Sequence, residues 1–118
     1  MNIDYFSKVR ILDGGMGQTL LEKGLKAKGS LWSATALIEE KYHQLVIDTH
    51  LDFIKSGADV IVTNNFSARR SRTLQNNVDE HFNYANQKAG ELALKAKEVS
   101  KKNILVAGSL PAQYDTYV

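Results

Sequence analysis

The sequence predicts an α/β fold with a parallel sheet, and three observations support this. Short apolar segments alternate with longer segments whose apolar residues recur at helical spacing. The links from each helix into the next strand are short, whereas the links that leave a strand are longer. The resulting order, strand-helix-strand-helix-strand, is typical of a parallel sheet with right-handed crossovers.

Three apolar segments are expected to be parallel strands that are buried in the fold: residues 9–13, 59–63 and 104–107. The second, Asp-Val-Ile-Val-Thr, is rich in β-branched residues, as expected of a strand covered on both faces. A glycine pair stops the first strand and a Gly-Ser pair stops the third.

Two long helices are expected between these strands, over residues 35–56 and 78–101. Gly57 is well placed to end the first of them. A brief helix is expected over residues 17–23, and residues 64–77 form a polar loop with room for a helical turn. One face of the first long helix carries Ile38, Tyr42, Leu45, Val46, Thr49 and Phe53 at helical spacing.

No domain boundary interrupts this pattern, so residues 1–118 are expected to form one partial domain. Residues 110–118 follow the third strand without a helix that could return to cover it. Three strands with two long helices would leave apolar strand edges open. Because a full (β/α)8 barrel needs roughly 250 residues, we expect residues 1–118 to be the N-terminal part of such a barrel, truncated after the third strand.

The composition excludes several classes of protein. The chain contains no cysteine, which excludes disulfides, thiolate catalysis and cysteine-ligated metal within these 118 residues. A net charge of +2 is too small to indicate binding to nucleic acid or to an anionic membrane. No apolar run approaches the roughly 20 residues that span a bilayer. The first ten residues lack the apolar core of a signal peptide, so a cytoplasmic location is expected.

Polar residues follow all three expected strands, where parallel α/β folds place their active sites. Asp13 ends the first strand, Thr63 and Asn64 end the second, and Ser109 follows the third. This set suits a small polar ligand, especially one whose ammonium group pairs with Asp13. The spacing supports equally well a role for Asp13 as the N-cap of the following short helix.

Several other motifs have weaker functional interpretations. The segment 15–20 begins like a dinucleotide-binding G-x-G-x-x-G, but a leucine replaces the third glycine, so we favour a sharp turn. The basic loop residues Arg69, Arg70 and Arg72 could clamp a phosphate or carboxylate, although a solvated loop with local salt bridges is favoured. Trp32 is either a core anchor or an aromatic wall of a ligand pocket.

The three histidines are expected to be surface or partly packed side chains. His43 and His50 are seven residues apart, about 10 Å along a helix, which is too far to share a metal ion. His81 lies in an early turn of the second long helix.

Four motifs, in order and in register, resemble the homocysteine S-methyltransferase family along essentially the whole chain. Residues 11–20 resemble the opening of that family, and residues 31–34 resemble the segment before its first long helix. Residues 57–66 resemble its second strand, which commonly ends in Thr-Asn-Thr-Phe or Thr-Asn-Ser-Tyr. Residues 107–111 resemble the end of its third strand.

The resemblance implies a (β/α)8 barrel that transfers a methyl group to homocysteine, giving methionine. The donor would be a sulfonium, a quaternary ammonium or a folate. It also implies a zinc ion held by three cysteines, which stabilises the homocysteine thiolate. Because this chain has no cysteine, all three ligands would lie beyond residue 118, and no residue here is expected to be catalytic or to bind metal.

By position, the resemblance implies a set of substrate-binding residues on this chain. Asp13 and Gly14 match residues near the amino-acid part of homocysteine, and Trp32 matches an aromatic residue near the methyl donor. The second strand contributes Thr63, Asn64 and Phe66 to the pocket, and the third contributes Ser109. Gln18 and Asn65 differ from the commoner choices of the family, which affects local contacts.

Two alternatives stay open at this point. The chain could be a non-catalytic half-barrel that assembles with a partner, or with itself, through its open strand edges. It could also belong to a different (β/α) enzyme that binds a phosphorylated substrate through the three loop arginines, but the four family motifs have no role in that case.

Overall fold

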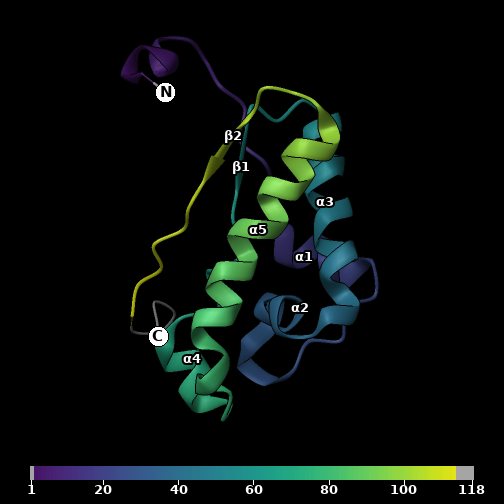
Figure 1. Ribbon diagram of the computed structural model, residues 1–118, viewed down its shortest axis with the longest axis vertical. Helices are drawn as coiled ribbons and strands as arrows, with labels where there is room; N and C mark the ends of the chain where they lie inside the picture. The colour runs from purple at the N-terminus through teal and green to yellow at the C-terminus, as the bar shows by residue number, and fades with distance from the viewer. Residues whose placement is uncertain (1, 114–118) are drawn as a thin grey trace.

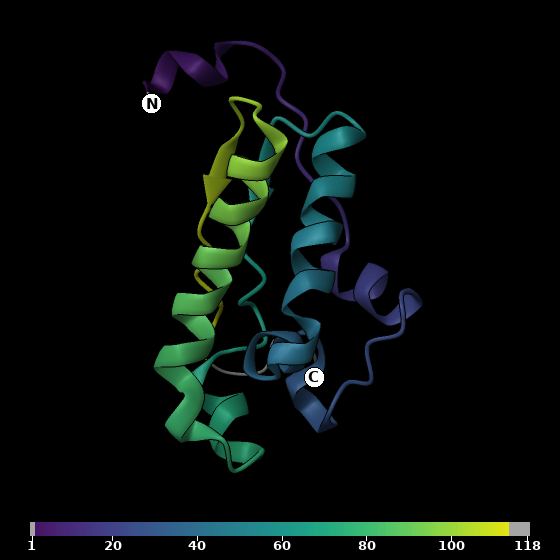
Figure 2. The ribbon, with the colours of Figure 1, turned by 45° about the vertical axis from the view of Figure 1, so that its right-hand side comes forward.

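The computed structural model describes residues 2–113. Two parallel strands lie against two long helices, α3 and α5, which run side by side (Figures 1 and 2). The α-helices are α1 (Met16–Glu22), α2 (Thr35–Ile38), α3 (His43–Lys55), α4 (Arg70–Gln75) and α5 (Phe82–Ser100). The strands are β1 (Val60–Val62) and β2 (Leu105–Ala107). The 3-10 helices are η1 (Ile3–Ser7), η2 (Gly29–Ala34), η3 (Glu40–Tyr42) and η4 (Asp79–His81).

The second and third expected strands pair as predicted. β1 and β2 are parallel, with Ile61 opposite Val106. The chain between them forms the predicted long helix α5 and, in the preceding loop, the short helix α4. Residues 110–118 were expected to follow β2 without a helix; residues 114–118 of that segment lie outside the described residues.

The first expected strand is largely absent, so the prediction of three strands is wrong for this structure. Residues 9–13 make a single parallel bridge, from Leu12 to Val60, and Leu12 is 60% exposed rather than buried. Side-chain carboxylates replace main-chain acceptors on both sides of this bridge. Asp59 Oδ2 accepts from the Ile11 amide at 2.8 Å, and Asp13 Oδ2 accepts from the Val62 amide at 2.9 Å. Residues 9–13 are therefore hydrogen-bonded to β1 without forming a continuous strand beside it.

The long helix expected over residues 35–56 is interrupted. Glu39 adopts an extended conformation (φ −93°, ψ 111°) between α2 and the turn that leads into α3. His43 Nε2 donates to the Leu37 carbonyl at 2.7 Å, so a side chain satisfies a carbonyl at the break. The apolar spacing continues across the interruption, which explains why the sequence pattern predicted one uninterrupted helix. Gly57 ends α3 with a positive φ of 113°, as predicted.

The core lies between the helices and the strands, and small side chains allow close packing there. Alanines recur along the inner face of α5 at helical spacing: Ala85, Ala89, Ala93 and Ala96 are all buried. Near β1 and β2, Ala93 and Ala96 pack with Ile54, Ile61 and Ile104, whereas Ala85 and Ala89 belong to a second cluster with Leu20 and Leu37. Within residues 2–113, no helix is both long enough and apolar enough to cross a membrane.

Candidate functional site

A hollow of about 410 Å³ lies at the carboxyl ends of the strands. We call it the strand-end hollow. It is lined by residues from the end of the first segment, the start of α1, the η2 turn and the ends of β1 and β2. All seven residues that the sequence and the resemblance pointed to lie on it: Asp13, Gly14, Trp32, Thr63, Asn64, Phe66 and Ser109.

Asp13 forms one wall and is held firmly by β1. Its amide donates to the Val60 carbonyl at 3.0 Å, and its Oδ2 accepts from the Val62 amide at 2.9 Å. Burial raises the pKa of Asp13 above its ordinary value, and the hydrogen bonds from the Val62 amide and its own amide oppose that shift. The N-cap of α1 is Gly15, without a side-chain cap, so the N-cap role considered for Asp13 is wrong.

Trp32 contributes an aromatic side chain to the lining of the hollow. Its backbone lies at φ 47°, ψ −121°, a conformation that L-residues rarely adopt. The ring lies against α1, where a Cβ added to Gly17 would be 2.8 Å from Trp32 Cη2. The side chain is 40% exposed and lines the hollow, which favours the aromatic-wall interpretation over a core anchor. Backbone strain of this kind concentrates at ligand sites.

We expect Gly17→Ala to displace the Trp32 ring, because the new methyl group would overlap the indole. Trp32 is the only tryptophan, so its fluorescence emission and its quenching by iodide report the change directly. Gly90→Ala is the matched control: it lies within α5 with nothing within 4 Å of the added Cβ, so it should leave fluorescence unchanged. Identical spectra for Gly17→Ala and wild type would contradict the close contact.

Hydrogen bonds hold the polar residues that line the hollow. Asn64 is buried, and its Nδ2 donates to the Ser33 carbonyl at 3.2 Å, which joins the end of β1 to the η2 turn. Thr63 Oγ1 accepts from the Ser109 amide at 3.2 Å and so joins the ends of the two strands. Phe66 is 41% exposed at the edge, with the Arg69 guanidinium 5.3 Å from its ring centre.

The sequence interpretation missed three residues that shape this site. Gly17 was assigned only to a turn, yet its lack of a side chain leaves room for the Trp32 ring. Ser33 lines the hollow and accepts from Asn64. Asn65 was noted only as a departure from the family pattern, yet it bonds to Thr63 and Ser109. Asn65 could have been found from its position, because it is a polar residue directly after Thr63 and Asn64. No local pattern in the sequence marked Gly17 or Ser33.

The loop arginines are not arranged as an anion clamp. Arg70 pairs with Asp79 at 2.7 Å, and Arg72 Nη1 donates to the Ser30 carbonyl at 2.7 Å. Arg69 is only 1% exposed, so the expectation of a wholly solvated loop is wrong for this residue. Of the described residues that line the strand-end hollow, none is one of these arginines.

His50 also departs from expectation. It is fully buried rather than at the surface or partly packed, and burial lowers its pKa to about 4. Neither ring nitrogen has a hydrogen-bond partner within residues 2–113. The other two histidines are partly exposed, as predicted.

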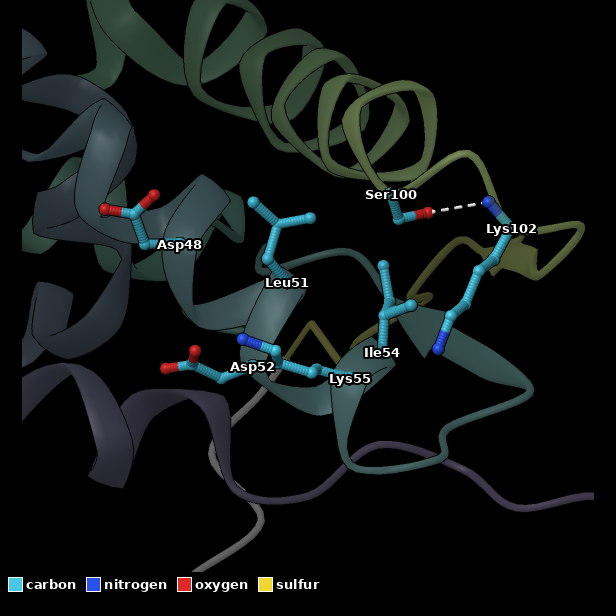
Figure 3. A pocket seen from close by; sticks show the side chains of 7 residues that line it. All are labelled: Asp48, Leu51, Asp52, Ile54, Lys55, Ser100 and Lys102. Atoms are coloured by element: carbon cyan, nitrogen blue, oxygen red, sulfur yellow. Dashed lines mark hydrogen bonds between the residues drawn. The ribbon is translucent and has the colours of Figure 1, made fainter.

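A larger hollow, of about 670 Å³, lies between the ends of α3 and α5 (Figure 3). Its apolar lining is Leu51 and Ile54, and Asp52, Lys55 and Lys102 add charges of both signs. These helix ends lead into the beginnings of β1 and β2, so this hollow lies at the opposite end of the sheet from Asp13 and Ser109. Active sites of parallel α/β folds lie at the strands' carboxyl ends, so the smaller hollow is the candidate site.

The described residues, 2–113, do not fit a metal site. Among residues 2–113, no group of three or more histidine, aspartate or glutamate side chains is placed to hold a metal ion. The sequence contains no cysteine. What the strand-end hollow offers instead is a carboxylate, amide and hydroxyl groups, and two aromatic walls, which together suit a small zwitterionic ligand.

Comparison with known proteins shows which family the chain matches. Residues 10–118 match the family model described as homocysteine S-methyltransferase. Homocysteine S-methyltransferase of Escherichia coli (strain K12) is 32% identical over 117 residues, covering 93% of this chain and 37% of that protein. Homocysteine S-methyltransferase 2 of Zea mays is 30% identical, covering 92% of this chain and 31% of that protein.

The structural match covers a similar share of the chain. The crystal structure of the homocysteine methyltransferase MmuM from Escherichia coli, metallated form, superposes with a TM-score of 0.76 at 31% identity. The match covers 92% of this chain and 40% of that structure, so the chain spans well under half the length of these relatives. By its sequence and its structure, the chain belongs to the homocysteine S-methyltransferase family.

Proposed function

We propose that this chain forms the N-terminal part of a (β/α)8-barrel homocysteine S-methyltransferase, and that its strand-end hollow binds the substrates. In the proposed reaction, a methyl group passes from a sulfonium, quaternary ammonium or folate donor to the sulfur of homocysteine, giving methionine. The observation that carries the proposal is the gathering of seven residues, at the family's motif positions, around one hollow at the strand ends.

Asp13 is proposed to pair with the ammonium group of homocysteine. Its carboxylate lines the hollow and is oriented by the Val62 amide, and a fixed carboxylate of this kind binds an ammonium group in a charge-assisted hydrogen bond. Gly14 beside it also lines the hollow, and an added Cβ there would lie 3.0 Å from Phe53 Cε1. Asn64 and Ser109 line the same hollow and are proposed to bind the polar parts of the substrate.

Trp32 and Phe66 are proposed to contact the methyl donor. Both are partly exposed, at 40% and 41%, and both line the hollow. A sulfonium or quaternary ammonium donor carries a positive charge, which aromatic faces attract. The zinc ion associated with this activity is proposed to be held by cysteines outside residues 1–118, so the part assigned to this chain is binding and orientation.

The test is to express the protein from its complete reading frame and to measure methionine formation. Homocysteine is supplied with zinc and, in separate reactions, S-methylmethionine, betaine or methyltetrahydrofolate, which represent the three donor classes. We expect methionine from at least one donor and a strong loss of activity in Asp13→Asn. No methionine from any donor, with zinc bound and the protein folded, would contradict the proposed function.

A second candidate is the non-catalytic half-barrel that assembles with a partner through exposed apolar side chains, which the rest of a barrel would cover equally well. Ile11 and Leu12 are 57% and 60% exposed beside β1, and Leu110 after β2 is fully exposed. Paired strand edges would cover such residues. Sedimentation of residues 1–118 tests it: a single defined assembly supports this role, and a monomer contradicts assembly with itself.

A further inference from the structure

The end of the β1–β2 ladder is continued by side chains, which is the starting point of this inference. The last main-chain bond of the ladder runs from the Thr63 amide to the Ala107 carbonyl at 2.9 Å. In a regular parallel pair, the next bonds would link the amide and carbonyl of Ser109 to the main chain of the neighbouring strand. Here the Ser109 amide donates to Thr63 Oγ1 at 3.2 Å, and the Ser109 carbonyl accepts from Asn65 Nδ2 at 3.1 Å.

Asn65 uses the full hydrogen-bonding capacity of its side-chain nitrogen. Its Nδ2 donates to the Ser109 carbonyl and, at 3.0 Å, to Asn86 Oδ1 on α5. Its Oδ1 accepts from Thr63 Oγ1 at 2.7 Å. Asn86 is itself held on α5, because its Nδ2 donates to the Ala68 and Phe82 carbonyls, each at 2.9 Å. The polar network therefore connects both strand ends to a rigid helix.

The network lies behind the wall of the strand-end hollow. Thr63 and Ser109 line the hollow, whereas Asn65 and Asn86 are not among its lining residues. Side chains are longer than the main-chain groups that they replace, so they can hold two strands together while the main chains separate. Asp13 does the same on the other side of β1, where its carboxylate accepts from the Val62 amide.

We propose that Asn65 is a positioning residue that fixes Ser109, and with it the third-strand wall of the hollow, for binding of homocysteine. The proposal rests on the proposed function for the identity of the ligand. Asn65 acts through Ser109 and Thr63 and has no contact with the substrate itself. The sulfur chemistry and the methyl donor do not involve it.

Asn65→Asp tests the proposal in the protein expressed from its complete reading frame. The substitution keeps the shape but replaces the Nδ2 donor with an oxygen that faces two acceptors, Ser109 O and Asn86 Oδ1. We expect the KM for homocysteine to rise about tenfold, with a much smaller change in kcat. The Ser109 amide should also exchange its hydrogen faster, because its carbonyl is no longer held.

Two matched variants separate positioning from general destabilisation. Asn86→Asp keeps an oxygen for Asn65 Nδ2 but loses the bonds to Ala68 and Phe82, so it should lower the melting temperature with little change in KM. Asn83→Asp adds the same charge at an exposed site on α5 and should change neither the melting temperature nor the KM for homocysteine.

Equal rises in KM for Asn65→Asp and Asn86→Asp would overturn the proposal, as would an unchanged KM in Asn65→Asp. If the wild type fails to methylate homocysteine, the proposed function fails, and hydrogen exchange at Ser109 still tests the positioning. Faster exchange in Asn65→Asp alone would support it, and unchanged exchange would overturn it.

Discussion

Replacing Asp13 with asparagine is expected to weaken homocysteine binding about thirtyfold, which corresponds to about 2 kcal/mol. The loss arises because the amide cannot pair with the ammonium group of the substrate. This free-energy loss is at the lower end of the range for a buried charged pair, because Asp13 is only half-buried and water screens the interaction. Titration calorimetry with homocysteine, on the protein expressed from its complete reading frame, measures the effect.

The asparagine variant should stay folded, since its side-chain oxygen can still accept from the Val62 amide. Burial raises the pKa of Asp13, so wild-type affinity should begin to fall in acid at a higher pH than an exposed aspartate would give. The asparagine variant has no carboxyl group to titrate there and should show no such fall. An affinity within threefold of wild type would contradict the pairing of Asp13 with the substrate.

His50 is expected to make the protein lose stability as the pH falls from about 6.5 to about 4. The unfolded imidazole titrates near 6.5, whereas burial lowers the pKa of the folded imidazole to about 4. Below the unfolded value, the unfolded chain therefore binds a proton that the folded chain does not, and protonation favours unfolding. The loss should reach about 3 kcal/mol at the lower end of this range.

Urea unfolding of wild type and His50→Leu at several pH values between 7 and 4 isolates this contribution. Leucine fills a similar volume and removes two buried nitrogens that have no hydrogen-bond partner within residues 2–113. His50→Leu should therefore be at least as stable as wild type at pH 7 and should lose less stability in acid. His81→Gln, at a partly exposed position, is the control. Equal losses in wild type and His50→Leu would contradict the account.

The parts of the fold that the sequence predicted are those with a local signal. β1 and β2 are runs of apolar residues followed by polar ones, and that pattern placed Thr63, Asn64 and Ser109 at one edge. The range of α5 was also predicted, because helical spacing is a property of neighbouring residues.

The features that the sequence did not predict depend on contacts between residues distant in sequence, or on a backbone conformation that has no local signal. The pairing of residues 9–13 is limited by bonds from Ile11 to Asp59 and from Val62 to Asp13, which join residues 48 and 49 positions apart. The role of Asn65 depends on Ser109, 44 positions away. The unusual backbone of Trp32 also had no local signal, because tryptophan carries no preference for positive φ.

The most direct test of the central claim is to map homocysteine on the protein by NMR. The isotope-labelled protein, expressed from its complete reading frame, is titrated with homocysteine while its backbone amide signals are followed. We predict saturable shifts at Gly14, Asn64 and Ser109, which line the strand-end hollow. Shifts confined to the opposite end of the sheet, near Leu51 and Lys102, or no shifts at all, would contradict the assignment of homocysteine to this site.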